Sequence, residues 1–335
     1  MMKRSPTRRH FLELAGASVL AGSIAAPHVR AAGKLDPATV TLDWRVTGYH
    51  TPFFLGLEQK IFEAQGIDLT VNPGNGSRNT IIAAAANNTT FGMADATALP
   101  PGVLQGAEVK MFSLYMGTTP FGIMFKKESG IAKPKDLESR AYGDFPGSAT
   151  YALFPTFAKK AGIDVSKVKI VNISPAAQFS SLLDNQVDAT FTALNDSYVT
   201  LSHQGAALGN FSYAEQGLNV LSQGLIAGPE TLKNRDLVKR FAQAFNQSVA
   251  AVKADPQKAA EVTKKLVPAA PDVAVQVDMI KDLVAHRLTN ARTTGKPAGW
   301  MAEADWRDLV DLLAEAGTLK EKVALDRLYT NDFVA

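Results

Sequence analysis

Three side chains that can contact a planar ligand occur together near the start of the chain: Trp44, Tyr49 and His50. They lie between a stretch of alternating apolar residues and a stretch with helical apolar spacing, so a loop that joins a strand to a helix carries them. In an α/β sheet, such a loop leaves the carboxyl end of a strand and faces the ligand crevice. Aromatic rings favour flat partners. We therefore expect these side chains to contact a bound molecule; the alternative is that Trp44 and Tyr49 cover the core.

Small polar residues recur where a predicted helix follows a predicted strand. Backbone N–H groups and hydroxyls at such places can bind a carboxylate, a phosphate or a polar ring edge. Ordinary helix capping explains any single one of them equally well. The candidates at helix starts and strand ends are Ser77, Asp95, Thr97, Thr118, Thr119, Ser148, Thr150, Asn195 and Asp196. If several of them converge with the aromatic residues, they form a binding site.

The sequence offers little for catalysis or metal binding. It has no cysteine, which excludes thiol nucleophiles, disulfides and iron–sulfur clusters. Beyond the first 31 residues the histidines are His50, His203 and His286, too widely spaced to form a metal pair. The segment 73–77 contains Gly-x-Gly but lacks the third glycine of a dinucleotide loop. The composition permits a Ser/His/Asp catalytic triad, but no sequence motif marks one serine as its nucleophile. We predict no catalytic residue, no metal and no cofactor.

Residues 1–31 have the pattern of an export signal. A basic head is followed by an apolar stretch of small residues and by a small-x-Ala site at residues 29–31. Arg8 and Arg9 resemble a twin-arginine signal, although Glu13 stands where such signals usually carry Lys. The alternatives are an ordinary secretory signal and an uncleaved anchor. No cysteine follows the apolar stretch, so the chain is not predicted to be a lipoprotein.

The net charge of the chain belongs largely to this leader. The 335 residues carry a formal charge of +3, and the first 31, with five Lys or Arg and one Glu, carry +4, so the remainder is close to −1. A nearly neutral body without basic clusters predicts binding neither to nucleic acid nor to an anionic membrane, and no stable membrane insertion after cleavage. About 300 residues are long enough to bury a core without disulfides.

Strand and helix patterns alternate after the leader, which predicts parallel sheets flanked by helices. The predicted strands are residues 40–44, 67–71, 109–115, 122–125, 168–173, 189–193 and 220–226. The predicted helices are 52–65, 78–87, 149–160, 176–185 and 196–203. Pro155 predicts a kink or an early end in the helix predicted over 149–160. From Pro229 onward only amphipathic helices are predicted, at 229–253, 256–266, 272–287 and 302–316.

Several of these segments resemble the NMT1/THI5-like solute-binding proteins of ABC importers. The opening Leu-Asp-Trp-(x)4-Tyr-His-x-Pro-x-Phe-Leu and the Phe-Glu-Ala-Gln-Gly-Ile-Asp-Leu that begins at Phe62 are similar to the first strand, helix and strand of that family. Residues 91–95 resemble its third strand. Residues 182–189 resemble its leucine helix and following strand, and residues 224–244 its return strand. The resemblance covers nearly all of residues 38–255.

The resemblance implies a type II periplasmic-binding-protein fold of two α/β lobes joined by a two-crossing hinge, with the C-terminal helices on lobe one. Lobe one would comprise residues 36–120 plus 225–335, lobe two residues 121–222, with crossings near 119–122 and 222–225. The implied partners are a small-molecule ligand and the permease and ATPase of an ABC transporter. We expect a monomer in the periplasm of a Gram-negative bacterium.

The resemblance also includes an enzyme, because Tyr49 to Pro52 match the fungal hydroxymethylpyrimidine phosphate synthases. Those enzymes carry a pyridoxal-phosphate lysine and a histidine where this chain has Ala94 and Ala98, and they carry a cysteine-rich segment that is missing here. We therefore expect a binding protein and not an enzyme. The aromatic residues favour a pyrimidine or another nitrogen heterocycle as ligand; sulfonate, nitrate and aromatic acids are the alternatives, for which Arg45 and Arg78 offer charge.

Overall fold

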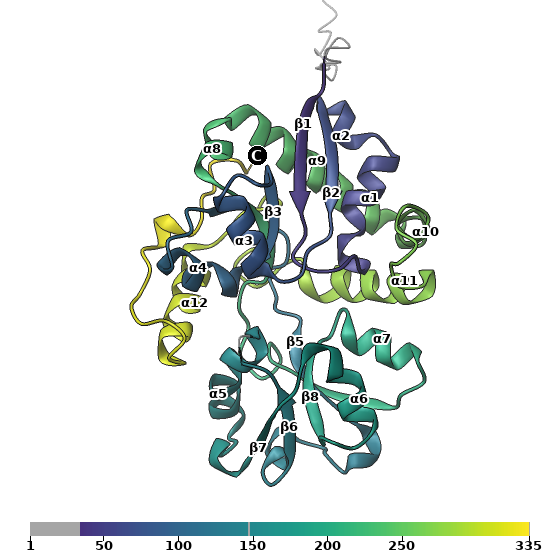
Figure 1. Cartoon of the computed structure of the whole chain (residues 1–335), viewed down its shortest axis with the longest axis vertical. Helices are drawn as coiled ribbons and strands as arrows, with labels where there is room; N and C mark the ends of the chain where they lie inside the picture. Colours follow the sequence, from purple (N-terminus) through teal and green to yellow (C-terminus); the bar gives the residue numbers. More distant parts are fainter. Residues whose placement is uncertain (1–33, 147, 335) are drawn as a thin grey trace, which may run out of the picture. The chain divides into compact units, whose positions relative to one another are not determined.

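The computed structural model describes residues 34–146 and 148–334; the predicted export signal lies outside them. Two five-stranded sheets with surrounding helices form two α/β lobes (Figure 1). This confirms the predicted fold class.

The first sheet has the strand order β2-β1-β3-β10-β4. Its strands are β1 (Asp36–Thr41), β2 (Ile67–Asn72), β3 (Phe91–Asp95), β4 (Lys110–Leu114) and β10 (Gln223–Ala227). β1 pairs in parallel with β2 and β3, whereas β10 runs antiparallel to β3 and β4. A strand from late in the chain therefore fills a gap between two early strands.

The second sheet repeats this arrangement with the order β7-β6-β8-β5-β9. Its strands are β5 (Phe121–Lys126), β6 (Ala141–Asp144), β7 (Lys169–Asn172), β8 (Ala189–Ala193) and β9 (Leu208–Ser212). β5 is antiparallel to β8 and β9, and β6 pairs in parallel with β7 and β8. The predicted parallel pairing is present, but both sheets are mixed: β5 and β10, the first strands that the chain forms after each passage between the sheets, run antiparallel to their neighbours. The exact lobe boundaries stay predictions.

Helices cover the strands of both sheets. Those between the strands are α1 (Thr51–Glu58), α2 (Ile61–Ala64), α3 (Ser77–Ala85), α4 (Leu99–Leu104), α5 (Ala149–Ala161), α6 (Gln178–Leu183) and α7 (Ser197–His203). Those after β10 are α8 (Pro229–Lys233), α9 (Arg235–Ala254), α10 (Pro256–Leu266), α11 (Val273–Asp282), a π-helical turn η7 (Leu283–Arg287) and α12 (Glu303–Glu315). A 3-10 turn η1 (Gly48–His50) precedes α1, and η2 (Ala96–Ala98) precedes α4. No helix in the described ranges is long and apolar enough to cross a membrane.

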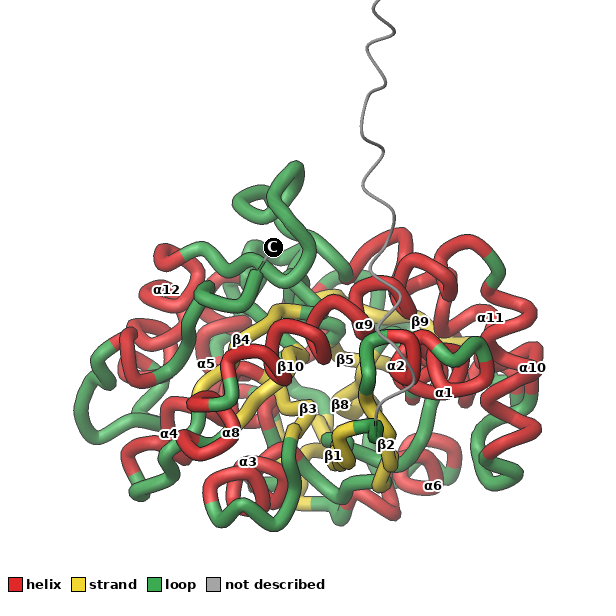
Figure 2. Tube along the Cα trace, turned by 90° about the horizontal axis from the view of Figure 1, so that it is seen from above, coloured by secondary structure: helices red, strands yellow, loops and turns green. Residues whose placement is uncertain are grey.

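Helix α9 closes the core of the first lobe, where Figure 2 shows it beside α2 and the strands. The Phe241 ring of α9 stacks on Phe91 of β3 with a centroid distance of 3.8 Å, and Phe112 of β4 lies beside both rings. In the second lobe, Tyr142 of β6 stacks on Phe154 of α5. Each sheet is thus held by aromatic packing against a helix, which is distant in sequence for α9 and follows directly after the strand for α5.

The structure corrects several boundaries. The helix predicted over 52–65 is interrupted at Lys60, which has a left-handed φ of 58°. Thr51 is the first residue of α1, and its hydroxyl donates to the carbonyl of Gly48, 2.9 Å away. The helix predicted over 229–253 is divided at Asn234, which caps α9 by accepting from the Leu237 amide. Pro155 does not end α5, which continues to Ala161. Strands β6 and β9 were not predicted because each contains a glycine and an Asp or Asn, residue types that are depleted in strands.

Candidate functional site

The loop after β1 folds around the carboxylate of Asp43, which is only 5% exposed. The Thr47 amide donates to Nδ1 of His50 at 3.1 Å, so Nε2 carries the proton and donates to Asp43 at 2.8 Å. The Tyr49 hydroxyl donates to the other carboxylate oxygen at 3.2 Å. Burial, followed by the nearby Asp43 charge, raises the pKa of Tyr49 well above its ordinary value. Both rings are therefore held by Asp43.

A second buried carboxylate, Asp95 at the end of β3, joins the same network. Its oxygens accept from the Thr97 amide at 2.9 Å and from the Ser222 hydroxyl at 2.7 Å. Gln223, which follows Ser222, donates to Asp43 at 3.3 Å. Burial raises the pKa of Asp95, while the hydroxyls of Thr97 and Ser222 lower it. The second passage between the lobes thereby links the two aspartates.

Ser77 also contributes to this end of β3. Its hydroxyl accepts from the Asp95 amide at 3.0 Å, which ties the start of α3 to the strand end. This interaction positions Asp95 and is distinct from ordinary capping of α3, where Gly76 occupies the N-cap position.

An ion pair joins the two lobes beside this network. Nη2 of Arg45, in the loop after β1, lies 3.3 Å from both carboxylate oxygens of Asp196, which precedes α7. Arg45 exposes half of its side chain, whereas Asp196 is 7% exposed as a residue. Burial raises the pKa of Asp196, and the Arg45 guanidinium acts in the opposite direction. Trp44 is adjacent to Arg45 and is 37% exposed, in contrast to the fully buried Trp306.

Asn195 lies next to Asp196 and is 1% exposed. Its Nδ2 faces the thioether sulfur of Met116 at 3.8 Å, a weak acceptor, and its Oδ1 has no hydrogen-bond partner among the described residues. A buried amide oxygen without a donor costs free energy, so it marks a place where a further donor is missing.

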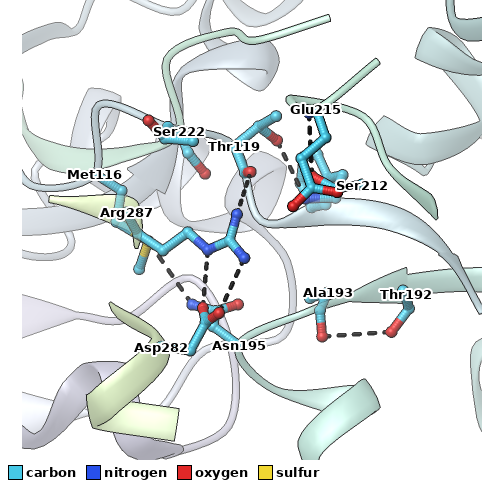
Figure 3. A network of polar contacts seen from close by, with 12 residues as sticks. Met116, Thr119, Thr192, Ala193, Asn195, Ser212, Glu215, Ser222, Asp282 and Arg287 are labelled. Carbon is cyan, nitrogen blue, oxygen red and sulfur yellow. Dashed lines mark hydrogen bonds and ion pairs between the residues drawn. The ribbon is translucent and has the colours of Figure 1, made fainter. Parts of the chain in front are cut away.

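Thr118 and Thr119 lie in the passage between β4 and β5 (Figure 3 shows Thr119). The Thr118 hydroxyl donates to the Thr289 carbonyl at 2.8 Å. The Thr119 carbonyl accepts from Nη1 of Arg287 at 3.1 Å, and Arg287 also pairs with both carboxylate oxygens of Asp282. The two threonines, predicted as ligand contacts, are thus bound to the C-terminal segment that holds this passage.

Ser148 and Thr150 surround a fourth buried carboxylate, Asp144 at the end of β6. Its Oδ1 accepts from both hydroxyls, at 2.7 and 3.2 Å, and from the Phe145 amide at 2.8 Å. Its Oδ2 accepts from the Tyr142 hydroxyl at 2.6 Å. Burial raises the pKa of Asp144 despite these donors. Because β6 and β8 are parallel neighbours, Asp144 and Asn195 follow the same edge of the second sheet.

The structure therefore places the predicted residues in three groups. The first group lies in or beside the network around Asp43 and Arg45 and comprises Trp44, Tyr49, His50, Ser77, Asp95, Thr97, Asn195 and Asp196. The second group, in the passage between β4 and β5, is Thr118 and Thr119. The third group, around Asp144, is Ser148 and Thr150. The prediction did not include Asp43, Asp144, Ser222 or Gln223. Asp43 stands between Leu42 and Trp44, where the alternation itself predicts an exposed polar residue, so the pattern contained no signal that this carboxylate is buried. The described residues contain no group of acidic and histidine side chains arranged to hold a metal ion.

Comparison with known proteins identifies a matching family model, two relatives by sequence and a solved structure with the same fold. The NMT1/THI5-like family model matches residues 47–259. A riboflavin-binding protein RibY from Chloroflexus aurantiacus is 24% identical over 324 residues, covering 94% of this chain and 90% of that protein. A 4-amino-5-hydroxymethyl-2-methylpyrimidine phosphate synthase from Legionella pneumophila is 24% identical over 229 residues, 67% of this chain and 72% of that protein. The aliphatic sulphonate-binding protein SsuA of Escherichia coli shares the fold, with a TM-score of 0.70 at 14% identity, over 89% of this chain and 99% of that one.

Proposed function

Because the chain belongs to the NMT1/THI5-like family, we propose that it is the exported solute-binding component of an ABC importer. In this proposal it captures a small planar nitrogen heterocycle between its lobes and delivers it unchanged to a permease and its ATPase. The observation that carries the proposal is the ion pair between Arg45 and Asp196, which joins the lobes. Its two members are the sequence neighbours of the partly exposed Trp44 and of Asn195, whose buried amide oxygen lacks a donor among the described residues.

The two curated relatives support a heterocycle as ligand. One is named for binding riboflavin and the other for making a pyrimidine phosphate, and both compounds contain flat nitrogen rings. The partly exposed Trp44 offers a ring face to such a compound. His50 is fully buried, with both ring nitrogens engaged, so we assign it the role of holding Asp43 in place of the ligand contact predicted from sequence.

The alternative function, a pyrimidine phosphate synthase, has less support from the side chains at the positions of the catalytic residues. Ala94 lies fully buried within β3 and Ala98 lies in η2, at the positions where the resemblance places the lysine and histidine of the synthases. A methyl group supplies neither a Schiff base nor a reacting imidazole. Binding without turnover is therefore the function that we propose.

A ligand screen tests this proposal. The chain without residues 1–31 would be titrated with riboflavin, hydroxymethylpyrimidine, aromatic acids, sulfonates and nitrate while its thermal unfolding is followed. A ligand at a hundredfold excess over Kd stabilises the folded state by about 2.7 kcal/mol. We expect a heterocycle to give this stabilisation and to be recovered intact. Conversion of the bound compound would contradict the binding role.

A further inference from the structure

Three buried carboxylates make the proposed site rich in hydrogen-bond acceptors. Asp43, Asp95 and Asp196 are at most 7% exposed, and hydrogen bonds of Gln223 and Ser222 link the first two. Asp43 raises the pKa of both Asp95 and Asp196 in addition to the effect of burial. An oxyanion brought to this place would meet the same repulsion.

Most of the cationic and polar donors nearby face these carboxylates; the Thr47 hydroxyl has no partner among the described residues, and Arg45 uses only Nη2 toward Asp196. The Arg45 guanidinium faces both oxygens of Asp196, and the Nε2–H of His50 points to Asp43. The Thr97 amide and the Ser222 hydroxyl donate to Asp95. An incoming sulfonate or nitrate would compete with a protein carboxylate for Nη2 of Arg45, for Nε2–H of His50 and for the donors to Asp95.

The second lobe shows the same pattern. The first turn of α5 could offer hydroxyls to an anion. These hydroxyls, of Ser148 and Thr150, already donate hydrogen bonds to Oδ1 of Asp144, as does the Phe145 amide. Asp144 is fully buried, so the chain supplies its own anion there.

The unsatisfied group has the opposite character. Asn195 is 1% exposed, and its Oδ1 is an acceptor without a donor among the residues that the structure describes. Its Nδ2 faces the Met116 sulfur, and the next residue in the chain, Asp196, forms the ion pair with Arg45. A ligand completes this arrangement if it brings an N–H or O–H.

We propose that the site selects neutral or cationic solutes that carry a ring N–H or an amino group, which donates to the Asn195 amide oxygen, and that it rejects oxyanions. The inference rests on the proposed solute-binding function and specifies its ligand class. It separates this chain from the sulphonate-binding protein whose fold it shares.

Calorimetric titration of matched variants tests the inference. The probes are riboflavin and hydroxymethylpyrimidine as donors, and ethanesulfonate and nitrate as oxyanions. Wild-type protein should bind a donor compound and neither anion. Asn195→Asp keeps an acceptor of the same shape and should retain binding within a few-fold, whereas Asn195→Leu removes the acceptor and should weaken it about tenfold or more, the equivalent of about 1.4 kcal/mol. Asn195→Ala, which also lacks an acceptor, replaces the leucine variant if the latter does not fold.

The outcomes separate the two proposals. Binding of ethanesulfonate or nitrate alone would overturn the ligand class but leave the solute-binding function standing. Equal losses in Asn195→Asp and Asn195→Leu, or no loss in either, would overturn the role of the amide oxygen. If the protein binds no compound of either class, the solute-binding function and the inference both fail.

Discussion

At the scale of the single residue, Asp43 depends on His50 for its strongest hydrogen bond. His50→Ala would leave a buried carboxylate without the donor that lies 2.8 Å away. An unsatisfied buried group costs about 1–3 kcal/mol, more when it is charged, so we expect the free energy of unfolding to fall by at least that amount. Urea denaturation measures the loss. His203→Ala is the control because His203 is partly exposed; an equal effect of both substitutions would contradict the positioning role.

Trp44 is the residue that we expect to act on the ligand and little on folding. Its indole is 37% exposed, so Trp44→Ala should change the unfolding free energy little. If the ring stacks on the solute, the substitution should weaken binding by about 1–3 kcal/mol, or roughly ten- to hundredfold in Kd. Trp306→Ala is the matched control, because Trp306 is fully buried and its loss should cost about 3–5 kcal/mol in stability. A destabilised Trp44→Ala protein with unchanged affinity would contradict this assignment.

The aromatic cluster illustrates what sequence could and could not reveal about single residues. The alternation up to Trp44 indicated a strand before Tyr49 and His50, but the predicted strand 40–44 is displaced: β1 ends at Thr41, and Trp44 lies in the loop that follows it. The alternation could not show that Asp43 engages both rings, because the orientation of Asp43 also depends on Gln223, which is 180 positions away in the chain. Long-range hydrogen bonds decide which polar side chains stay free, and local patterns do not contain them.

At the scale of the element, the end of β6 and the start of α5 should respond to pH through Asp144. Burial raises the folded-state pKa of Asp144 above the unfolded value of about 3.9. The folded protein therefore binds the proton more tightly, so this group's contribution to stability is present below the unfolded pKa and is lost as pH rises through the folded one. Asp144→Asn is the reference variant, because its amide has no carboxyl proton to gain or lose. Relative to that variant, the wild-type melting temperature should rise as pH is lowered from about 7 to 4; a constant difference would contradict the expectation.

The elements themselves followed from local patterns where these were long. The helices predicted over 256–266 and 302–316 match α10 and α12 to within one residue at each end, whereas those predicted over 52–65 and 229–253 are each divided in the structure. Gly66, with its left-handed φ of 72°, ends the α2 region as predicted. The antiparallel direction of β5 and β10 was not predicted, because direction in a sheet depends on how the chain passes between the lobes and not on the strand's own residues.

At the scale of the whole molecule, export is a prediction that rests on the sequence of the leader. If Arg8 and Arg9 form a twin-arginine pair, replacing both with Lys should leave the precursor in the cytoplasm. Immunoblots of periplasmic and cytoplasmic fractions measure the distribution, and Lys3→Arg is a control that keeps the pair. Full export of the double-Lys protein would indicate the general secretory route instead.

The two lobes are joined by polar contacts that sequence alone did not reveal. Arg45 pairs with Asp196, and His203 at the end of α7 lies 3.0 Å from Asp278 of α11. Helix α7 is thus held at both ends by the first lobe. The family resemblance predicted two lobes, but only the coordinates identify the charged residues that meet between them.

The most direct test of the binding account is a crystal structure of the chain without its leader, grown with the heterocycle that stabilises it most. We predict one unchanged molecule per chain, with its ring against Trp44 and an N–H group within hydrogen-bond distance of the Asn195 amide oxygen. A compound bound away from both residues, or a chemically altered compound, would contradict the account.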